Sequence, residues 1–106
     1  MSSGFKLSAE DDTYIYPFST ASESLKLKVW NKGRPIPNCD PGIWRWDMCG
    51  KLMRYSEHGN TDSDRGWEID HIFPRAKGGR DDVDNLQPLN WRTNRRKSDT
   101  YPYYCQ

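Results

Sequence analysis

The chain has 106 residues, which is enough for one small domain with a limited hydrophobic core. Hydrophobic residues make up 34% of the chain, and five Trp, six Tyr and three Phe supply much of the area that a core could bury. The N-terminus is polar, and no apolar run approaches the length of a membrane span. These features predict an intracellular protein that does not enter membranes.

The formal net charge of +1 conceals four blocks of alternating sign. Residues 1–24 carry one base and four acids, and residues 25–60 carry seven bases and three acids. Residues 61–90 carry four bases and seven acids, and residues 91–106 carry four bases and one acid. Clustered acids suit a bound cation and flanking bases suit a polyanion. The pattern therefore favours a polyanion that is bound through a metal ion.

The N-terminal third holds few apolar residues at first and then a short periodic run. We interpret residues 1–24 as an arm that is partly disordered or lies against the domain of residues 25–106. Apolar residues alternate with lysines over residues 25–30, which predicts a half-buried strand. Three Pro and two Gly predict a loop over residues 31–42.

The next segment has the pattern of a β-hairpin. Aromatic and charged residues alternate over residues 43–55, and the chain is expected to turn near Gly50. Two interpretations of Arg45 stay open: it reaches a phosphate, or it forms a surface pair with Asp47 worth less than about 1 kcal/mol. Residues 56–66 are polar and contain Gly, which indicates a loop.

The last third combines two strands and a helix. Residues 67–73 form an apolar run that predicts a strand, and Pro74 cannot continue its hydrogen-bonded ladder. A returning strand is predicted over residues 85–89. Asn90 is a good N-cap for a helix over residues 91–99.

This last segment, about residues 67–99, resembles the ββα-metal unit of the HNH nuclease family. The residues that carry the resemblance are, in chain order, Asp70, His71, Pro74, Gly78, Gly79, Asn85, Leu86, Asn94 and Lys97. The resemblance implies an α+β fold in which a ββα-metal (HNH) unit is preceded by a strand and a β-hairpin. It also implies a metal-dependent endonuclease that hydrolyses DNA phosphodiester bonds and leaves 5′-phosphate and 3′-hydroxyl ends.

The polar residues of this segment fit the chemistry of phosphodiester hydrolysis, in which negative charge must be neutralised and water activated. Asp70 and Asn94 offer the oxygen ligands that suit Mg²⁺ or Mn²⁺. His71 carries an imidazole that can accept the proton of water. The resemblance assigns the same roles and adds Asn85 as the residue that orients His71. In a regular strand Asp70 and His71 point to opposite faces, so one shared site requires the strand to end or twist there.

Basic residues around this site are expected to bind nucleic acid. Lys97 shares a helical face with Asn94, which predicts that it acts beside the metal-bound phosphate. Backbone contacts are expected from five arginines: Arg45, Arg75, Arg92, Arg95 and Arg96. Double-stranded DNA is the expected partner, while RNA as a substrate and a homodimer stay open.

The remaining candidates receive simpler interpretations. Cys39, Cys49 and Cys105 form no C-x-x-C pair, unlike the cysteines that bracket the motif in many HNH proteins. We therefore expect no structural zinc and thiols that are buried or idle. His58 and the three Asp of residues 81–84 are expected to be solvated in loops rather than to bind a metal.

Two functions besides that of an active endonuclease stay open. One is a catalytically inactive DNA-binding module of HNH fold, against which the intact Asp70, His71, Asn85 and Asn94 argue. The other is a nuclease toxin with a cognate inhibitor.

Overall fold

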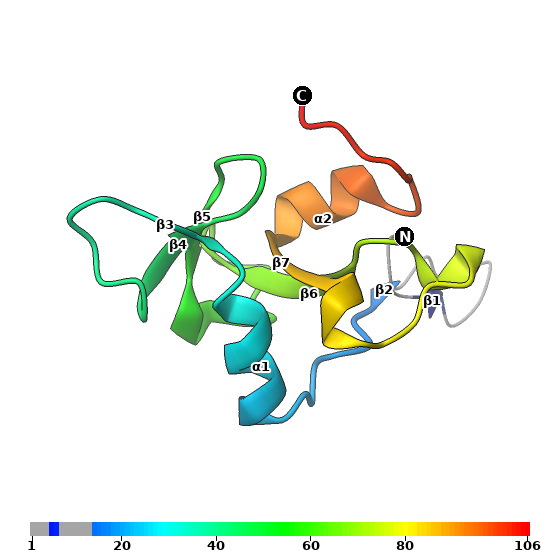
Figure 1. Ribbon diagram of the computed structural model, residues 1–106, viewed down its shortest axis with the longest axis horizontal. Helices are drawn as coiled ribbons and strands as arrows, with labels where there is room; N and C mark the ends of the chain where they lie inside the picture. Colours follow the sequence, from blue (N-terminus) through cyan, green and yellow to red (C-terminus); the bar gives the residue numbers. More distant parts are fainter. Residues whose placement is uncertain (1–4, 7–13) are drawn as a thin grey trace.

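The computed structural model describes residues 5–6 and 14–106, and shows a small α+β chain (Figure 1). Its two helices are α1 (Glu23–Trp30) and α2 (Trp91–Lys97). Its strands are β1 (Phe5–Lys6), β2 (Tyr14–Ile15), β3 (Arg34–Pro35), β4 (Trp44–Trp46), β5 (Leu52–Arg54), β6 (Trp67–His71) and β7 (Leu86–Asn90). Three 3₁₀ turns, η1 (Tyr55–Glu57), η2 (Arg75–Lys77) and η3 (Val83–Asn85), lie in the connections. The predicted fold class is confirmed.

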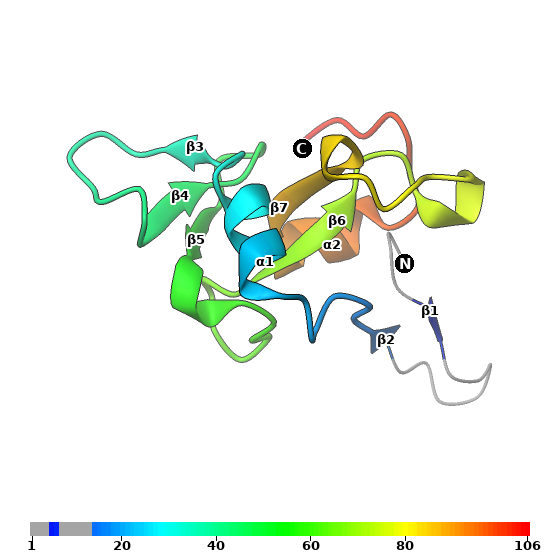
Figure 2. The ribbon, with the colours of Figure 1, turned by 60° about the horizontal axis from the view of Figure 1, so that its bottom comes forward.

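The strands form antiparallel pairs in three small sheets. They are the pair β1–β2, the three-stranded sheet β3–β4–β5 and the hairpin β6–β7. The helix α2 follows β7 directly, so β6, β7 and α2 make a ββα unit. The helices α1 and α2 lie on opposite sides of the β6–β7 hairpin (Figures 1 and 2). The hairpin is therefore covered on both faces, which explains why every residue of β6 is buried.

The hydrophobic core lies between α1 and the hairpin. It is made of the buried side chains Val29, Trp30, Met53, Trp67, Ile69 and Leu86. Trp67 and Ile69 come from alternate positions of β6, as a period of two predicts. The ring centroids of Trp30 and Trp67 are 5.1 Å apart. Since two large aromatic rings bury much apolar area, they compensate for the small number of aliphatic residues.

The strand predicted over residues 25–30 is wrong, because this segment is the helix α1. Ser22 caps it by accepting a hydrogen bond from the backbone N–H of Leu25 at 3.1 Å. Leu25 and Val29 are four residues apart and face the core, whereas Leu27 is 45% exposed. The apolar residues alternate as in a strand, but Leu25 and Val29 also have the i, i+4 spacing of one helical face.

The predicted hairpin over residues 43–55 is confirmed by β4 and β5, and its turn has a left-handed residue, Gly50, with φ +81°. The loop predicted over residues 31–42 is only partly right. Arg34 and Pro35 form the short strand β3 on the edge of β4. Proline is tolerated there because an edge strand leaves N–H groups unpaired.

The ββα unit differs from its prediction only at the ends. The strand β6 stops at His71, two residues before the predicted end, and Phe73 is 41% exposed. The predicted N-cap is confirmed, since the side chain of Asn90 accepts from the N–H of Arg92 at 2.9 Å. The helix ends at Lys97 rather than at residue 99, because Ser98 has a φ of 48° and leaves the helical conformation.

The expectation that all three cysteines are buried or idle thiols is wrong. Cys49 and Cys105 form a disulfide, and Cys39 is a free and exposed thiol. The disulfide joins the turn between β4 and β5 to the segment that follows α2. Two residues 56 positions apart in the sequence meet there, which spacing alone does not reveal. Over residues 5–6 and 14–106, no helix has the length and apolar character needed to cross a membrane.

Candidate active site

The interface between β6 and α2 is polar, although it is buried. Glu68 and Asp70 alternate with the core residues of β6 and are each no more than 1% exposed. Glu68 accepts a hydrogen bond from Asn94 Nδ2 at 2.8 Å and pairs with Arg95 at 2.6 Å. Asp70 pairs with Lys97, whose Nζ lies 3.0 Å from Asp70 Oδ2. Two carboxylates and two cations therefore occupy a place where an ordinary small domain would pack apolar side chains.

Two further contacts fix Asp70 and Lys97. The amide Nε2 of Gln87, which lies opposite Asp70 in the hairpin register, donates to Asp70 Oδ2 at 3.1 Å. The ammonium of Lys97 also donates to the backbone carbonyl of His71 at 2.9 Å. Lys97 thus joins the carboxylate of Asp70 to the end of β6.

His71 closes β6 and has a fully buried side chain. Its Nε2 lies 2.6 Å from Asp81 Oδ1, and its ring packs against Phe18 with centroids 5.3 Å apart. A neutral imidazole that donates from Nε2 to this carboxylate keeps its lone pair on Nδ1. Within the described residues, Nδ1 has no hydrogen-bond partner. This tautomer leaves Nδ1 as the atom that can take up a proton.

The expected residues are neighbours, but they divide between the two sides of β6. Asp70 and Asn94 belong to the interface with α2, whereas the ring of His71 contacts Phe18 and the loop after β6. The strand does end at His71, as a shared site requires. The backbone carbonyl of His71 links the two sides through Lys97.

Asn85 holds the loop between β6 and β7. Its Oδ1 accepts from the N–H of Phe73 at 2.8 Å, and its Nδ2 donates to the carbonyls of Phe73 at 3.0 Å and Arg80 at 2.9 Å. Phe73 lies two residues after His71, and Arg80 directly precedes Asp81. Asn85 therefore fixes the loop at Phe73 and Arg80, and none of these three bonds reaches the imidazole of His71.

Close backbone packing in this loop explains one of its glycines. A Cβ added to Gly79 would lie 1.7 Å from the carbonyl oxygen of Phe73, so no other residue fits without movement of the backbone. Gly78 has a φ of 102°, which side chains disfavour. The loop that carries Asp81 to His71 is thus tightly folded.

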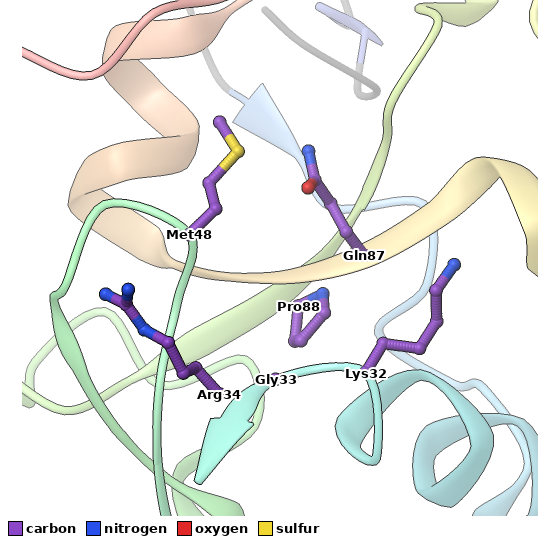
Figure 3. Close-up of a pocket in the computed structure, with 6 residues that line it drawn as sticks. All are labelled: Lys32, Gly33, Arg34, Met48, Gln87 and Pro88. Atoms are coloured by element: carbon purple, nitrogen blue, oxygen red, sulfur yellow. The ribbon is translucent and has the colours of Figure 1, made fainter. Parts of the chain in front are cut away.

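The two side chains bound to Asp70, those of Gln87 and Lys97, meet pockets although Asp70 itself is buried. Both line a pocket of about 170 Å³ under the C-terminal segment, together with Met48, Ile72, Tyr101, Pro102 and Tyr103. Gln87 also lines a second pocket of about 300 Å³, with Lys32, Gly33, Arg34, Met48 and Pro88 (Figure 3). The partners of Asp70, rather than Asp70 itself, meet these pockets.

The basic residues of α2 are placed differently from one another. Lys97 is only 2% exposed and bound to Asp70, so the expectation that it acts at the phosphate is not supported by its position. Arg95 is used inside the protein, where it pairs with Glu68 and lies 3.9 Å from the ring centroid of Tyr14. Arg92 is bound to Asp64 at 2.6 Å. Arg96 is exposed, and so is Arg75 in the loop after β6.

Neither interpretation of Arg45 describes its contacts. Its guanidinium donates to the carbonyls of Gly33 at 2.8 Å and Pro41 at 2.9 Å, and thereby holds the loop before β4. Asp47 is buried and accepts from the N–H groups of Cys49 and Asn90, at 2.9 Å and 3.0 Å. The surface pair between Arg45 and Asp47 is therefore wrong. Asp47 instead joins the hairpin turn to the start of α2.

The interpretation of His58 as a solvated loop residue is also wrong. Its Nε2 lies 2.9 Å from the hydroxyl of Tyr16, and its ring packs on Trp67 with centroids 4.8 Å apart. Burial, with a smaller effect of the positive charge of Lys26, lowers the pKa of His58 to about 4. The hydroxyl of Tyr16 accepts from the N–H of Ile69, so it donates its own proton to the neutral imidazole.

Residues 14–18 lie against the domain through Tyr16 and Phe18, which pack on the core. The division into an arm of residues 1–24 and a domain of residues 25–106 stays a prediction, and residues 1–4 and 7–13 lie outside the described part.

The family model of HNH endonucleases matches residues 47–100, which is just over half of the chain. The chain belongs to the HNH endonuclease family. No curated protein and no solved structure matches it.

The residues of this HNH domain fit the divalent metal that HNH nucleases generally use. A carboxylate and a side-chain carbonyl, from Asp70 and Asn94, are hard oxygen donors of the kind that Mg²⁺ accepts together with water. Because the amide Nδ2 of Asn94 donates to Glu68, the Oδ1 of Asn94 points away from that carboxylate. The described residues hold no group of three or more His, Cys, Asp or Glu that would bind a metal.

Proposed function

We propose that this protein is an active endonuclease that hydrolyses phosphodiester bonds of double-stranded DNA with the help of a divalent cation, most simply Mg²⁺. The observation that carries the proposal is the buried polar interface of Glu68, Asp70, Asn94 and Lys97. Buried charges cost stability unless they are paired, and apolar residues would hold α2 to the hairpin at least as well. An interface of this kind is better explained by chemistry than by folding.

In the proposed reaction, His71 is the general base. Its Nε2–H donates to Asp81, and Nδ1 takes the proton of the attacking water. Asp70 and Asn94 would hold the cation, which when bound neutralises negative charge at the phosphoryl group and the leaving oxygen. Asn85 and Gly79 fix the loop that carries Asp81, so they position His71 without touching the substrate.

Lys97 has a positioning role in this proposal. Its ammonium holds the carboxylate of Asp70 and the carbonyl of His71 at fixed places. Arg75 and Arg96, which are exposed, remain proposed contacts to the DNA backbone, and Arg92 would exchange Asp64 for a phosphate. Arg45 and Arg95 are bound to protein groups, so a direct contact to DNA from them is not part of the proposal.

The test is cleavage of supercoiled plasmid by the full chain, with Mg²⁺ or with EDTA. We expect nicked or linear product with Mg²⁺ only, and a loss of cleavage in the Asp70→Asn variant. Labelling of the product ends should find 5′-phosphates and 3′-hydroxyls. Lys28→Ala, which removes an exposed charge on α1, is the matched control and should cleave normally. DNA binding without any cleavage would contradict the proposal and favour an inactive binding module.

A further inference from the structure

One face of the sheet β3–β4–β5 carries tryptophans and arginines side by side. In the register of this sheet, Trp44 lies opposite Arg54 and Trp46 lies opposite Arg34. These residues share a face, because Met53, between Leu52 and Arg54, points into the core. We call the surface formed by Arg34, Trp44, Trp46, Arg54 and Arg65 the Trp–Arg face.

Each arginine of the Trp–Arg face lies over an indole ring. Arg34 is 5.4 Å from the ring centroid of Trp46, and Arg54 and Arg65 are 5.3 Å and 5.7 Å from that of Trp44. A guanidinium over an aromatic ring keeps its N–H edge available and loses part of its rotational freedom beforehand. Both effects favour a bidentate contact to an anion such as a phosphate.

The three arginines are exposed and form no ion pair with any carboxylate in residues 14–106. Arg92 on α2, by contrast, is bound to Asp64. Solubility does not require three arginines gathered on one face, because lysines dispersed over the surface would provide it equally well. Their charge is complementary to a polyanion.

The Trp–Arg face is rigidly connected to the ββα unit. Asn90, at the end of β7, donates through Nδ2 to the carbonyl of Leu52 at 2.9 Å, and its N–H donates to Asp47 at 3.0 Å. The disulfide between Cys49 and Cys105 ties the turn between β4 and β5 to the segment that follows α2. The sheet β3–β4–β5 lies beside the hairpin β6–β7 (Figures 1 and 2).

One pocket lies between Arg34 of the Trp–Arg face and Gln87, a partner of Asp70. Arg34 from β3 and Gln87 from β7 line the same pocket of about 300 Å³ (Figure 3). Gln87 in turn donates to the carboxylate of Asp70. A sugar-phosphate backbone held by Arg34 would thus pass close to Gln87, which binds Asp70.

We infer that the Trp–Arg face binds the sugar-phosphate backbone of duplex DNA next to the site of cleavage, without reading base sequence. The inference rests on the proposed function for the identity of its partner. Duplex is favoured over single strands because guanidinium groups already cover Trp44 and Trp46, whereas binding of single strands relies on open aromatic faces for stacking.

The test is binding of a labelled duplex of arbitrary sequence to the full chain in EDTA, measured by fluorescence anisotropy at several salt concentrations. Each phosphate contact contributes about 0.9 to the slope of log K against log[salt]. The triple variant R34Q/R54Q/R65Q should therefore bind more weakly, with a slope smaller by about 3. The triple lysine variant R34K/R54K/R65K keeps the charges and should retain most of the slope. K28Q, which removes one exposed charge from α1, is the control and should change neither affinity nor slope.

Circular dichroism and a urea titration of each variant separate lost binding from lost folding. If R34Q/R54Q/R65Q is folded and has the slope of K28Q, the inference is overturned even where wild-type protein cleaves DNA. If the wild type does not cleave but its duplex binding depends on the three arginines, the proposed function fails and the inference stands. Tighter binding of single strands than of duplex, with quenching of Trp fluorescence, would overturn the assignment to duplex.

Discussion

Lys97 places its ammonium 3.0 Å from the carboxylate of Asp70 and 2.9 Å from the backbone carbonyl of His71. A single buried side chain of α2 therefore joins two consecutive residues of β6 to which the family resemblance gives different roles. The carboxylate is held on the α2 side and the carbonyl at the end of the strand. This arrangement makes the stability of the ββα unit and the geometry of its candidate active site depend on the same ion pair.

Replacement of Lys97 by Met should destabilise the protein strongly in EDTA. Loss of one partner leaves the carboxylate of Asp70 buried without its cation, which typically costs about 3–5 kcal/mol. Mg²⁺ should restore part of this loss, because a cation at Asp70 would replace the missing charge. Urea unfolding with EDTA and with Mg²⁺ measures both effects.

The control for this prediction is Arg96→Met, which removes an exposed charge from the same helix and should change stability by less than about 0.5 kcal/mol. The double variant D70N/K97M should be more stable than K97M, since it leaves no unpaired buried charge at position 70. Equal stability of K97M and wild type would show that the pair is not formed in solution.

Asp81→Asn should slow cleavage by about 10- to 100-fold, because the group that fixes the tautomer and the orientation of His71 is changed. Asp81 is 65% exposed, so the unfolding temperature and the affinity for DNA should change little. Asp84→Asn, a neighbouring exposed acid that does not contact His71, serves as the control. If the two variants cleaved at the same rate, the contact between Asp81 and His71 would have no part in the reaction.

His58 should make the protein less stable as the pH falls from about 6.5 to about 4. Its pKa is about 4 in the folded chain and 6.5 as the ordinary value, so the unfolded chain takes up a proton first. The contribution of His58 to the free energy of unfolding is therefore constant above pH 6.5 and falls progressively as the pH is lowered to about 4. The urea midpoint of wild type should fall across this window by more than that of His58→Gln. Parallel curves would contradict the assignment.

Titration of thiols in denatured protein purified without reductant should find one thiol per chain, that of Cys39, if the disulfide between Cys49 and Cys105 forms. Cys105→Ser should lower stability by about 2–4 kcal/mol. It should also raise hydrogen exchange in residues 101–106, which the disulfide ties to the hairpin turn. Three titratable thiols would show that the bond is absent.

The sequence predicted best those elements whose signals are local. Asn90 caps α2, Gly50 turns the hairpin, and Trp67 and Ile69 face the core, and each of these signals lies within a few residues. The prediction of a strand over residues 25–30 fails because three apolar residues at i, i+2 and i+4 fit both the strand period and the helix period. Local pattern alone did not decide between strand and helix.

The contacts of the candidate site could not be predicted, because they join residues that are distant in the chain. Nothing near Asp81 indicates that its carboxylate reaches His71, and nothing near Lys97 indicates that it is buried on Asp70. A loop that is rich in Asp and a helix that is rich in basic residues usually face the solvent. Only the fold brings the carboxylate of the loop and the ammonium of the helix to β6.

The most direct test of the central claim is the single-turnover rate at which an end-labelled duplex is cleaved in Mg²⁺ at saturating enzyme, for wild type and His71→Ala. If His71 takes the proton of the attacking water, the variant should lose about 10²- to 10⁴-fold in rate while its duplex affinity in EDTA stays unchanged. A folded His71→Ala variant that cleaves at the wild-type rate would contradict the account.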